Sequence, residues 1–349
     1  MTDIRKGRFS SQGHGRISGA LNDFYSLADG KGNEHMLVRI LYSMRSVILV
    51  ISFQSAIIAG LLSLLYGMFR LLPFLLVLLA FVMLHAESNL LNDYFGFRRG
   101  HDTPDSPRRR YTLHPLADNI LSNGQMLILI AGLGAVLLAI ASYFILLLGA
   151  GAFLLVTFGS VALLSYDAFP VTLKSIGLGE LASFVVWGPL MIGGGFYVIT
   201  GTETYGALLA SIPYGLGVMS ILVGKHLDQE AFDRNIGQRT LPVLIGSSVT
   251  RYLLIAILVL MYAIPVFSVF IGLLPLASLV ILLNWGRLSG AVRRIRKERP
   301  DTPPDGYIGW PLWYHRACLR HEKYFGWLFI SGLLLALLMT AVHIPSFIH

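Results

Sequence analysis

Charged residues are scarce in this chain of 349 residues, where Asp, Glu, Lys and Arg make up 13% and apolar residues 55%. Soluble domains carry about 25% charged residues. A water-soluble fold of this length would therefore lack the charge to cover its surface, and the apolar excess must face lipid. The composition predicts a polytopic integral membrane protein without a sizeable soluble domain.

Cysteine is nearly absent as well. The single Cys318 excludes an internal disulfide and a cysteine-based metal site. The N-terminal stretch is polar and rich in Gly and Ser, without the short apolar run of a signal peptide. We therefore predict a polar tail over 1–40 and a transmembrane domain over 41–349.

The formal net charge is +8. In a soluble protein this excess would suggest a nucleic-acid partner, but in a membrane protein positive charge gathers in cytoplasmic connections. We expect no nucleic-acid partner. The basic run near 287–297 would also suit anionic lipid, although it fits equally well as a topology anchor.

Long apolar runs are abundant, and a spanning helix needs about 20 such residues. They predict an all-α fold with about nine transmembrane helices, near 44–66, 71–91, 125–148, 151–166, 178–200, 205–224, 250–270, 271–286 and 326–345. Basic residues fall almost entirely on alternate connections, and only Arg70 lies on the other set. This asymmetry predicts a cytoplasmic N-terminus and an external C-terminus, in the cytoplasmic membrane.

A first polar cluster follows the second apolar run. Asn89, Asn92 and Asp93 are spaced so that a helix turns them toward one side, and Arg99 and Asp102 follow within ten residues. Carboxylate and amide oxygens suit Mg²⁺, and guanidinium groups bind phosphate oxygens. The pattern is typical of a site for a Mg²⁺-diphosphate, whereas a solvated basic loop is the plainer interpretation.

A second acidic cluster, made of Asp228, Glu230 and Asp233, follows the sixth run, with Arg239 close behind. The predicted topology puts both clusters on one membrane face, where they could flank one diphosphate with bridging ions. Lys174 lies on the same face between the fourth and fifth runs. Taken alone, Lys174 is more simply a topology anchor.

Four segments in order resemble the UbiA superfamily of intramembrane prenyltransferases, and within it the branch that prenylates 1,4-dihydroxy-2-naphthoate. They are NLLNDYFGFRRGHD at 89–102, YDAFPVTLKSIGLGE at 166–180, DRNIGQRTLPVLIG at 233–246 and GWPLWYHRACLRHEKYFGWLF at 309–329. The resemblance covers most of the chain beyond the tail.

The resemblance implies a ring of nine helices around a central cavity capped by the two acidic segments. It further implies that Mg²⁺ binds the diphosphate of a polyprenyl donor, and that an aromatic acceptor attacks the allylic cation formed when the diphosphate leaves. By motif position, Asn92, Asp102 and Asp233 bind or orient the metal. Arg99, Lys174 and Arg239 hold phosphate, and Tyr166 borders the acceptor or the first isoprene unit.

Two motif carboxylates are missing, because Gly96 and Gln229 stand where the family pattern has Asp. Three alternatives stay open: a shifted ligand set (Asp93, Asp102, Asp228 and Glu230), a single ion, or loss of metal-dependent ionisation. Asp228 is the most economical substitute, although one residue turns a helix by about 100°. The predicted metal ligands are therefore Asn92, Asp102, Asp228 and Asp233, and the predicted catalytic residues are Asn92, Asp93, Asp228 and Asp233.

The leading hypothesis is a Mg²⁺-dependent prenyltransferase whose partners are a polyprenyl diphosphate, an aromatic acceptor and the lipid bilayer. A UbiA-type terpene cyclase or an enzyme with an unusual acceptor is one alternative, and a catalytically silent isoprenoid-binding protein is another. A transporter would need broken, charged helices at the bilayer midplane, which this chain largely lacks. Ion-dependent release of diphosphate separates the enzymes from the silent protein.

Overall fold

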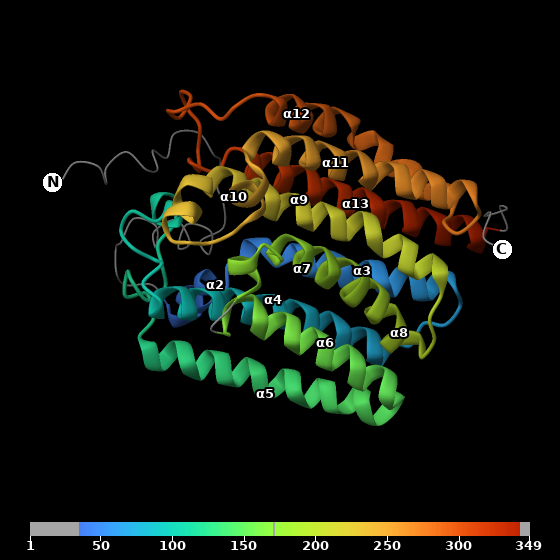
Figure 1. The fold of residues 1–349 in the computed structure, drawn as a ribbon. Helices are drawn as coiled ribbons and strands as arrows, with labels where there is room; N and C mark the ends of the chain where they lie inside the picture. The colour runs from blue at the N-terminus through green and yellow to red at the C-terminus, as the bar shows by residue number, and fades with distance from the viewer. Residues whose placement is uncertain (1–34, 170–171, 343–349) are drawn as a thin grey trace.

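A computed structural model describes residues 35–169 and 172–342, and within these ranges the protein is all-helical. Its long helices run side by side as one bundle (Figure 1). They are α3 (Val50–Leu65), α4 (Leu71–Arg98), α5 (Asn123–Leu148), α6 (Ala150–Asp167), α9 (Tyr205–Asn235), α11 (Ser247–Phe270) and α13 (Tyr314–Ala341). Shorter elements are α2 (Met36–Ser43), α7 (Gly179–Val185), α8 (Gly194–Thr200), α10 (Leu241–Ile245) and α12 (Trp285–Arg296), with η1 (Ser46–Ile48), η2 (Pro107–Arg110), η3 (Leu173–Ile176), η4 (Val186–Gly193) and η5 (Leu276–Asn284).

Eight helical segments of the described chain are long and apolar enough to cross a membrane. The ninth predicted span, 271–286, is not among them, so the count of nine is not confirmed. In its place the 3₁₀-helix η5 runs directly into α12, whose last turn carries Arg293, Arg294 and Arg296. This composite element packs against α11 and α13, but its second half is too basic for an ordinary span.

The helices that carry the motifs are longer than their apolar runs. Helix α4 continues to Arg98, α9 continues to Asn235, and α13 already begins at Tyr314. Hydropathy falls where charges begin, but helical hydrogen bonding carries on through these polar residues. The two polar clusters predicted as loops therefore lie largely on the ends of α4 and α9. Helix α2 begins at Met36, before the predicted start of the transmembrane domain at residue 41.

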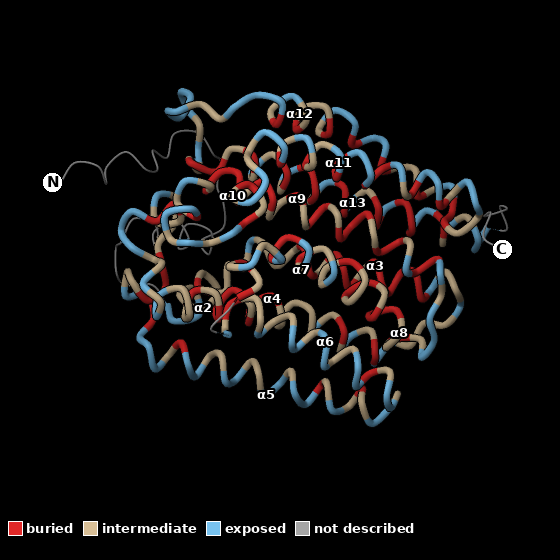
Figure 2. Tube along the Cα trace, viewed as in Figure 1, coloured by how far each residue is buried: buried red, intermediate tan, exposed pale blue. Residues whose placement is uncertain are grey.

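The core is asymmetric. The spans that contain α3 and α9 are the most buried, each with 61% of its apolar window buried, whereas α5 and α6 have only 11% buried. Buried residues accordingly gather along α3, α9 and α13, and α5 remains largely exposed (Figure 2). Because the exposed faces of α5 and α6 are apolar, these two helices are suited to lie against lipid.

One crossing is built from three pieces, α7, η4 and α8. The middle piece is a π-helical stretch that contains Pro189, which has no backbone N–H to continue the regular helical ladder. Gly188 and Gly215 let this stretch approach α9 closely, since a Cβ at Gly215 would lie 2.7 Å from the backbone oxygen of Phe184. The irregular turn also carries Trp187, whose side chain borders a large cavity.

Candidate functional site

Two adjoining cavities lie where the polar ends of α4, α6 and α9 meet. The larger, here called the apolar chamber, has a volume of about 850 Å³ and reaches between α3, α4, α5, α6, η4 and α9. The smaller, here called the polar chamber, has a volume of about 290 Å³. Five residues line both chambers: Arg45, Asn92, Arg108, Tyr111 and Lys225. A single ligand can therefore place a polar head in one chamber and an apolar body in the other.

Asp167 ties three elements together in the wall of the polar chamber. Its Oδ2 accepts a hydrogen bond from Asn92 Nδ2 on α4 at 2.6 Å, and its Oδ1 pairs with Lys174 Nζ of η3 at 2.7 Å. Arg99 donates to the backbone oxygens of Asp167 and Phe169, at 2.6 and 2.7 Å. Three predicted site residues, Asn92, Arg99 and Lys174, are thus brought together at the end of α6.

Asp102 folds back over the helix end at Gly96. A Cβ at Gly96 would lie only 2.5 Å from Asp102 Oδ2. His114 Nε2 is 3.2 Å from the same oxygen, while its Nδ1 accepts hydrogen bonds from the N–H groups of Leu116 and Ala117. Because Nδ1 accepts, Nε2 carries a proton and faces Asp102.

This environment acts on the acidity of Asp102 in two directions. Burial raises the pKa of the Asp102 carboxyl, but the hydrogen bond and charge of His114, together with Arg108, leave that pKa below its usual value. Asp102 is consequently held as an anion on the polar chamber, a state suited to bind a cation.

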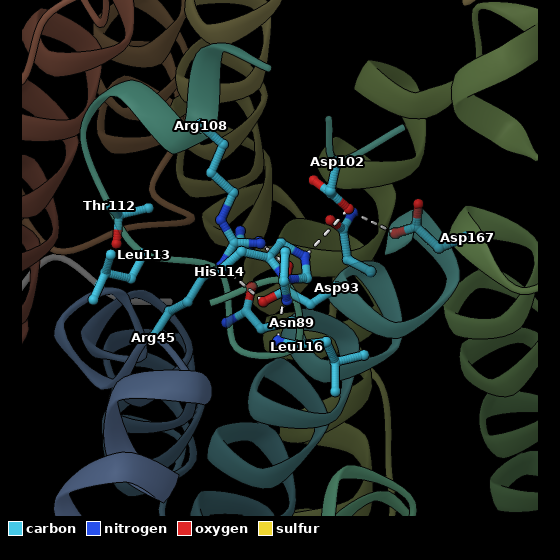
Figure 3. Close-up of polar contacts among 12 residues, drawn as sticks. Arg45, Asn89, Asp93, Asp102, Arg108, Thr112, Leu113, His114, Leu116 and Asp167 are labelled. Carbon is cyan, nitrogen blue, oxygen red and sulfur yellow. Dashed lines mark hydrogen bonds and ion pairs between the residues drawn. The ribbon is translucent and has the colours of Figure 1, made fainter. Parts of the chain in front are cut away.

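Asp93 faces a different direction from its neighbour Asn92. It is fully buried and pairs with Arg45 at 2.5 Å and with both terminal nitrogens of Arg108 (Figure 3). Asp93 does not line either chamber, whereas both arginines line both chambers. The carboxylate thus positions two guanidinium groups at the junction and has no oxygen turned toward the site.

Helix α9 contributes a face made of Lys225, Gln229 and Asp233, four residues apart, all of which line the polar chamber. Asp233 is buried, and its Oδ2 accepts a hydrogen bond from Thr240 at 3.2 Å. Lys225 donates no hydrogen bond within the described chain. The lysines and arginines that line the polar chamber number five, and the carboxylates number three. The polar chamber therefore suits an anionic head.

Residues 54–316 match the model of the UbiA prenyltransferase family. This chain belongs to the UbiA prenyltransferase family. The membership and the all-α membrane fold predicted from the sequence are thereby confirmed.

Relatives of known function match this UbiA-family chain at low identity. The 1,4-dihydroxy-2-naphthoate octaprenyltransferase of Escherichia coli (strain K12) is 26% identical over 267 residues, or 74% of this chain and 83% of that protein. The UbiA prenyltransferase domain-containing protein 1 homolog of Drosophila melanogaster is 28% identical over 186 residues, or 53% of this chain and 51% of that protein. The chain thus spans about half the length of this relative.

Solved structures share the fold. A UbiA homolog from Aeropyrum pernix K1, in its apo form, aligns with a TM-score of 0.61 at 19% identity, over 82% of this chain and 97% of that one. A UbiA homolog from Archaeoglobus fulgidus bound to GPP and Mg²⁺ aligns with a TM-score of 0.54 at 17% identity, over 85% and 98%. At these identities the likeness establishes the common fold.

Besides Asp93, the structure sets Asp228, Glu230 and Arg239 apart from the chambers. Both Asp228 oxygens accept hydrogen bonds from the backbone N–H groups of Tyr314 and His315 at the start of α13, at 3.0 and 2.9 Å. Arg239 is exposed, and neither residue lines a chamber. The shift by one residue from Gln229 therefore carries the Asp228 carboxylate to another side of α9.

Glu230, named in the shifted ligand set, is also turned outward and bonds Arg234 and Ser247. Tyr166 lines the apolar chamber, with Lys174 Nζ 5.0 Å from its ring centroid. Lys225, Arg45 and Arg108 were missed as site residues because each looks like an ordinary topology charge. The one sequence signal for Lys225 was that Lys225, Gln229 and Asp233 follow one another at intervals of four residues, which places them on one side of a helix.

The polar chamber offers oxygen ligands of the kind that Mg²⁺ prefers. No group of three His, Cys, Asp or Glu side chains able to hold a metal ion occurs among residues 35–169 and 172–342. The polar chamber does present Asp102 and Asp233, with amide groups of Asn92 and Gln229. Mg²⁺ is commonly held by one or two carboxylates together with substrate phosphates and water. The residues therefore fit an ion that arrives with a diphosphate.

Proposed function

We propose that this chain is a Mg²⁺-dependent intramembrane prenyltransferase that moves a polyprenyl group from its diphosphate to a hydroxylated aromatic acceptor. The observation that carries the proposal is the junction of a cationic polar chamber with a larger apolar chamber, through five shared residues. A prenyl diphosphate has the same division, with an anionic head and an apolar chain.

In the proposed reaction the bond between C1 of the donor and the diphosphate oxygen breaks, and the electron pair leaves with the diphosphate. An aromatic carbon of the acceptor then bonds C1 of the allylic cation and loses its proton to the leaving diphosphate or to water. Bound Mg²⁺ supplies charge neutralisation to the diphosphate. Asp102 and Asp233 would hold the ion, oriented by Asn92.

The cations of the chain supply the remaining stabilisation. Lys225, Arg45 and Arg108 line the junction where negative charge develops on the leaving diphosphate, and groups fixed in place before the reaction stabilise it most effectively. Lys174 is already paired with Asp167, so its charge is partly compensated. Among these cations Lys225, which bonds no described residue, is the one most available for a phosphate oxygen.

The acceptor class is supported by the relatives from Escherichia coli and Bacillus subtilis (strain 168), both named 1,4-dihydroxy-2-naphthoate octaprenyltransferases, at 26% and 24% identity. We propose an acceptor of this dihydroxynaphthoate type. The alternation of basic residues supports a cytoplasmic N-terminus and placement in the cytoplasmic membrane.

The test uses the full chain purified in lipid nanodiscs, with prenyl diphosphates of two to eight isoprene units and dihydroxynaphthoate. Donor binding and diphosphate release should both require Mg²⁺ and disappear with EDTA. Lys225→Met should weaken donor binding roughly 10- to 150-fold, the effect of losing a hydrogen bond to a charged group. Arg296→Met, which removes an exposed cation of α12, is the matched control and should bind normally.

Absence of Mg²⁺-dependent diphosphate release with every donor length would refute the enzyme. Release of diphosphate to give a cyclised hydrocarbon, with no acceptor adduct, would instead establish the cyclase alternative.

A further inference from the structure

The apolar chamber has two chemically different walls. The wall formed by α5 and α6 presents aliphatic and aromatic side chains, among them Leu137, Leu138 and Leu155. The wall formed by α4 and η4 presents His85 and Trp187, while Glu87 of α4 lines the chamber on the side of α5, where its Oε1 would lie 3.8 Å from a Cβ at Gly134. A prenyl chain gains by burial against the first wall and has no group that could bond the second. The polar wall therefore requires a different ligand.

His85 is fixed by a hydrogen-bonded relay. Trp187 Nε1 lies 3.0 Å from Ser52 Oγ, and that oxygen lies 3.0 Å from His85 Nδ1. An indole N–H can only donate, so Ser52 accepts from Trp187. The hydroxyl proton of Ser52 then goes to His85 Nδ1, because the alternative acceptor, Met191 Sδ at 3.9 Å, is weak. The proton of neutral His85 is consequently on Nε2.

Two polar groups of the apolar chamber have atoms without a partner among the described residues. His85 is 7% exposed, and its Nε2 bonds no residue of the described chain. Glu87 is 6% exposed, and its buried Oε2 has no hydrogen-bond partner among the described residues. An unpaired ionisable side chain inside a membrane protein is costly and by default marks a functional site.

The position of these groups relative to the reacting centre limits the size of their ligand. His85 precedes Asn92 by seven residues, which is about 10 Å along the axis of α4. Asn92 lies at the junction of the chambers, where the diphosphate of a donor would be held, so C1 would lie on the apolar side of it. A ring oxygen and one hydrogen bond reach about 6 Å from a reacting ring carbon, so a compact aromatic acceptor fits between C1 and His85.

We propose that His85 and Glu87 form an acceptor subsite for a hydroxylated aromatic ring. His85 Nε2–H donates to one ring oxygen, and Glu87 accepts from a ring hydroxyl. Ser52 and Trp187 are positioning residues that set the tautomer of His85. The proposal rests on the proposed prenyl transfer for its choice of ligand, and no bond is made or broken at these residues.

The first experiment measures binding without turnover. Equilibrium dialysis compares 1,4-dihydroxynaphthalene with its dimethyl ether on the purified chain in nanodiscs. The wild type should favour the dihydroxy compound roughly three- to tenfold, the effect of one or two neutral hydrogen bonds. Glu87→Leu should remove this preference, because only a hydroxyl can donate to Glu87, whereas Glu87→Gln, which keeps an acceptor oxygen, should retain part of it. His85→Leu should weaken the binding of both probes, since an ether oxygen still accepts a hydrogen bond.

The second experiment separates positioning from general damage. Trp187→Phe should raise the acceptor KM several-fold and leave the donor KM and the Mg²⁺ requirement unchanged. Leu137→Ala, on the opposite wall, is the matched control and should alter donor KM without changing the preference between the two naphthalene probes.

Equal binding of the two probes by the wild type, an unchanged preference in Glu87→Leu, or unchanged binding of both probes by His85→Leu would overturn the subsite. Because dialysis needs no catalysis, a chain that shows the preference but transfers no prenyl group would count against the proposed function and still support the subsite.

Discussion

At the scale of single residues, the site is shaped by two motif positions that lack a carboxylate. Gly96 leaves space that the Asp102 side chain fills, since Asp102 Oδ2 lies 2.5 Å from where a Cβ at 96 would be. Asp102 thus reaches the surface where the absent Asp would stand. Gln229 still lines the polar chamber but offers an amide in place of a charge. One carboxylate per helix end remains, which suits a single ion better than a bridged pair.

Adding a side chain at Gly96 should therefore harm the site. Gly96→Ala forces the Asp102 carboxylate to rotate away, and because that is the end of a flexible side chain we expect little loss of stability. Mg²⁺ affinity, measured in the presence of prenyl diphosphate, should fall about tenfold, as when the support of a metal site is disturbed. Thermal unfolding in detergent checks the first expectation and a Mg²⁺ titration the second.

Gly124→Ala serves as the control, since a Cβ there meets nothing within 4 Å. If Gly96→Ala, or Gly96→Asp, instead strengthened Mg²⁺ binding, Asp102 would not occupy the place of the missing ligand.

At the scale of elements, α9 assigns neighbouring acidic residues to different tasks. Asp233 faces the polar chamber, while Asp228 binds the first N–H groups of α13. These N–H groups have no partner within their own helix, and negative charge is favourable at a helix N-terminus. Asp228 therefore fastens α13 to α9 at the polar end of the bundle.

Replacing Asp228 should affect folding and leave metal binding alone. Asp228→Ala leaves two buried N–H groups unpaired and should lower the free energy of unfolding by roughly 1–3 kcal/mol. The Mg²⁺ concentration required for half-maximal donor binding should stay the same. Denaturant unfolding in detergent and the Mg²⁺ titration measure the two quantities separately.

Glu230→Ala, two residues away, removes only a partly exposed pair with Arg234 and a bond to Ser247, so its stability should change by less than about 1 kcal/mol. A large rise in the Mg²⁺ requirement of Asp228→Ala at unchanged stability would return Asp228 to the metal site.

At the scale of the whole molecule, the bundle separates its two ends by chemistry. The polar chamber lies with the ends of α4, α6 and α9, while the turn between α8 and α9 lies at the opposite end (Figure 1). If the basic end is cytoplasmic, the diphosphate head binds from the cytoplasmic side. The apolar chamber then extends into the membrane beside the lipid-exposed helices α5 and α6.

Cysteine labelling in sealed vesicles of known orientation tests this arrangement. Cys318 is buried and is the single cysteine, so the background is unreactive. Asp305→Cys and Thr202→Cys introduce thiols at exposed positions. An impermeant maleimide should label position 305 from the cytoplasmic side alone and position 202 from the external side alone. The reverse pattern would invert the proposed topology.

The sequence by itself determined the membrane class, the family and most of the spans, and it singled out Asn92, Arg99, Asp102, Lys174 and Asp233, all of which line the polar chamber. Those features follow from local hydropathy and from spacing along one chain. It did not determine that Asn92 and Asp93 face different partners, or that Asp228 caps α13, because spacing along a helix does not say which neighbouring element packs against each of its sides.

Tertiary structure alone decided the junction of the chambers and the Trp187–Ser52–His85 relay. The relay joins η4, α3 and α4, and its two hydrogen bonds link residues 135 and 33 positions apart in the chain. Neither short-range periodicity nor charge pattern carries information over such separations, since these contacts form only when the helices pack.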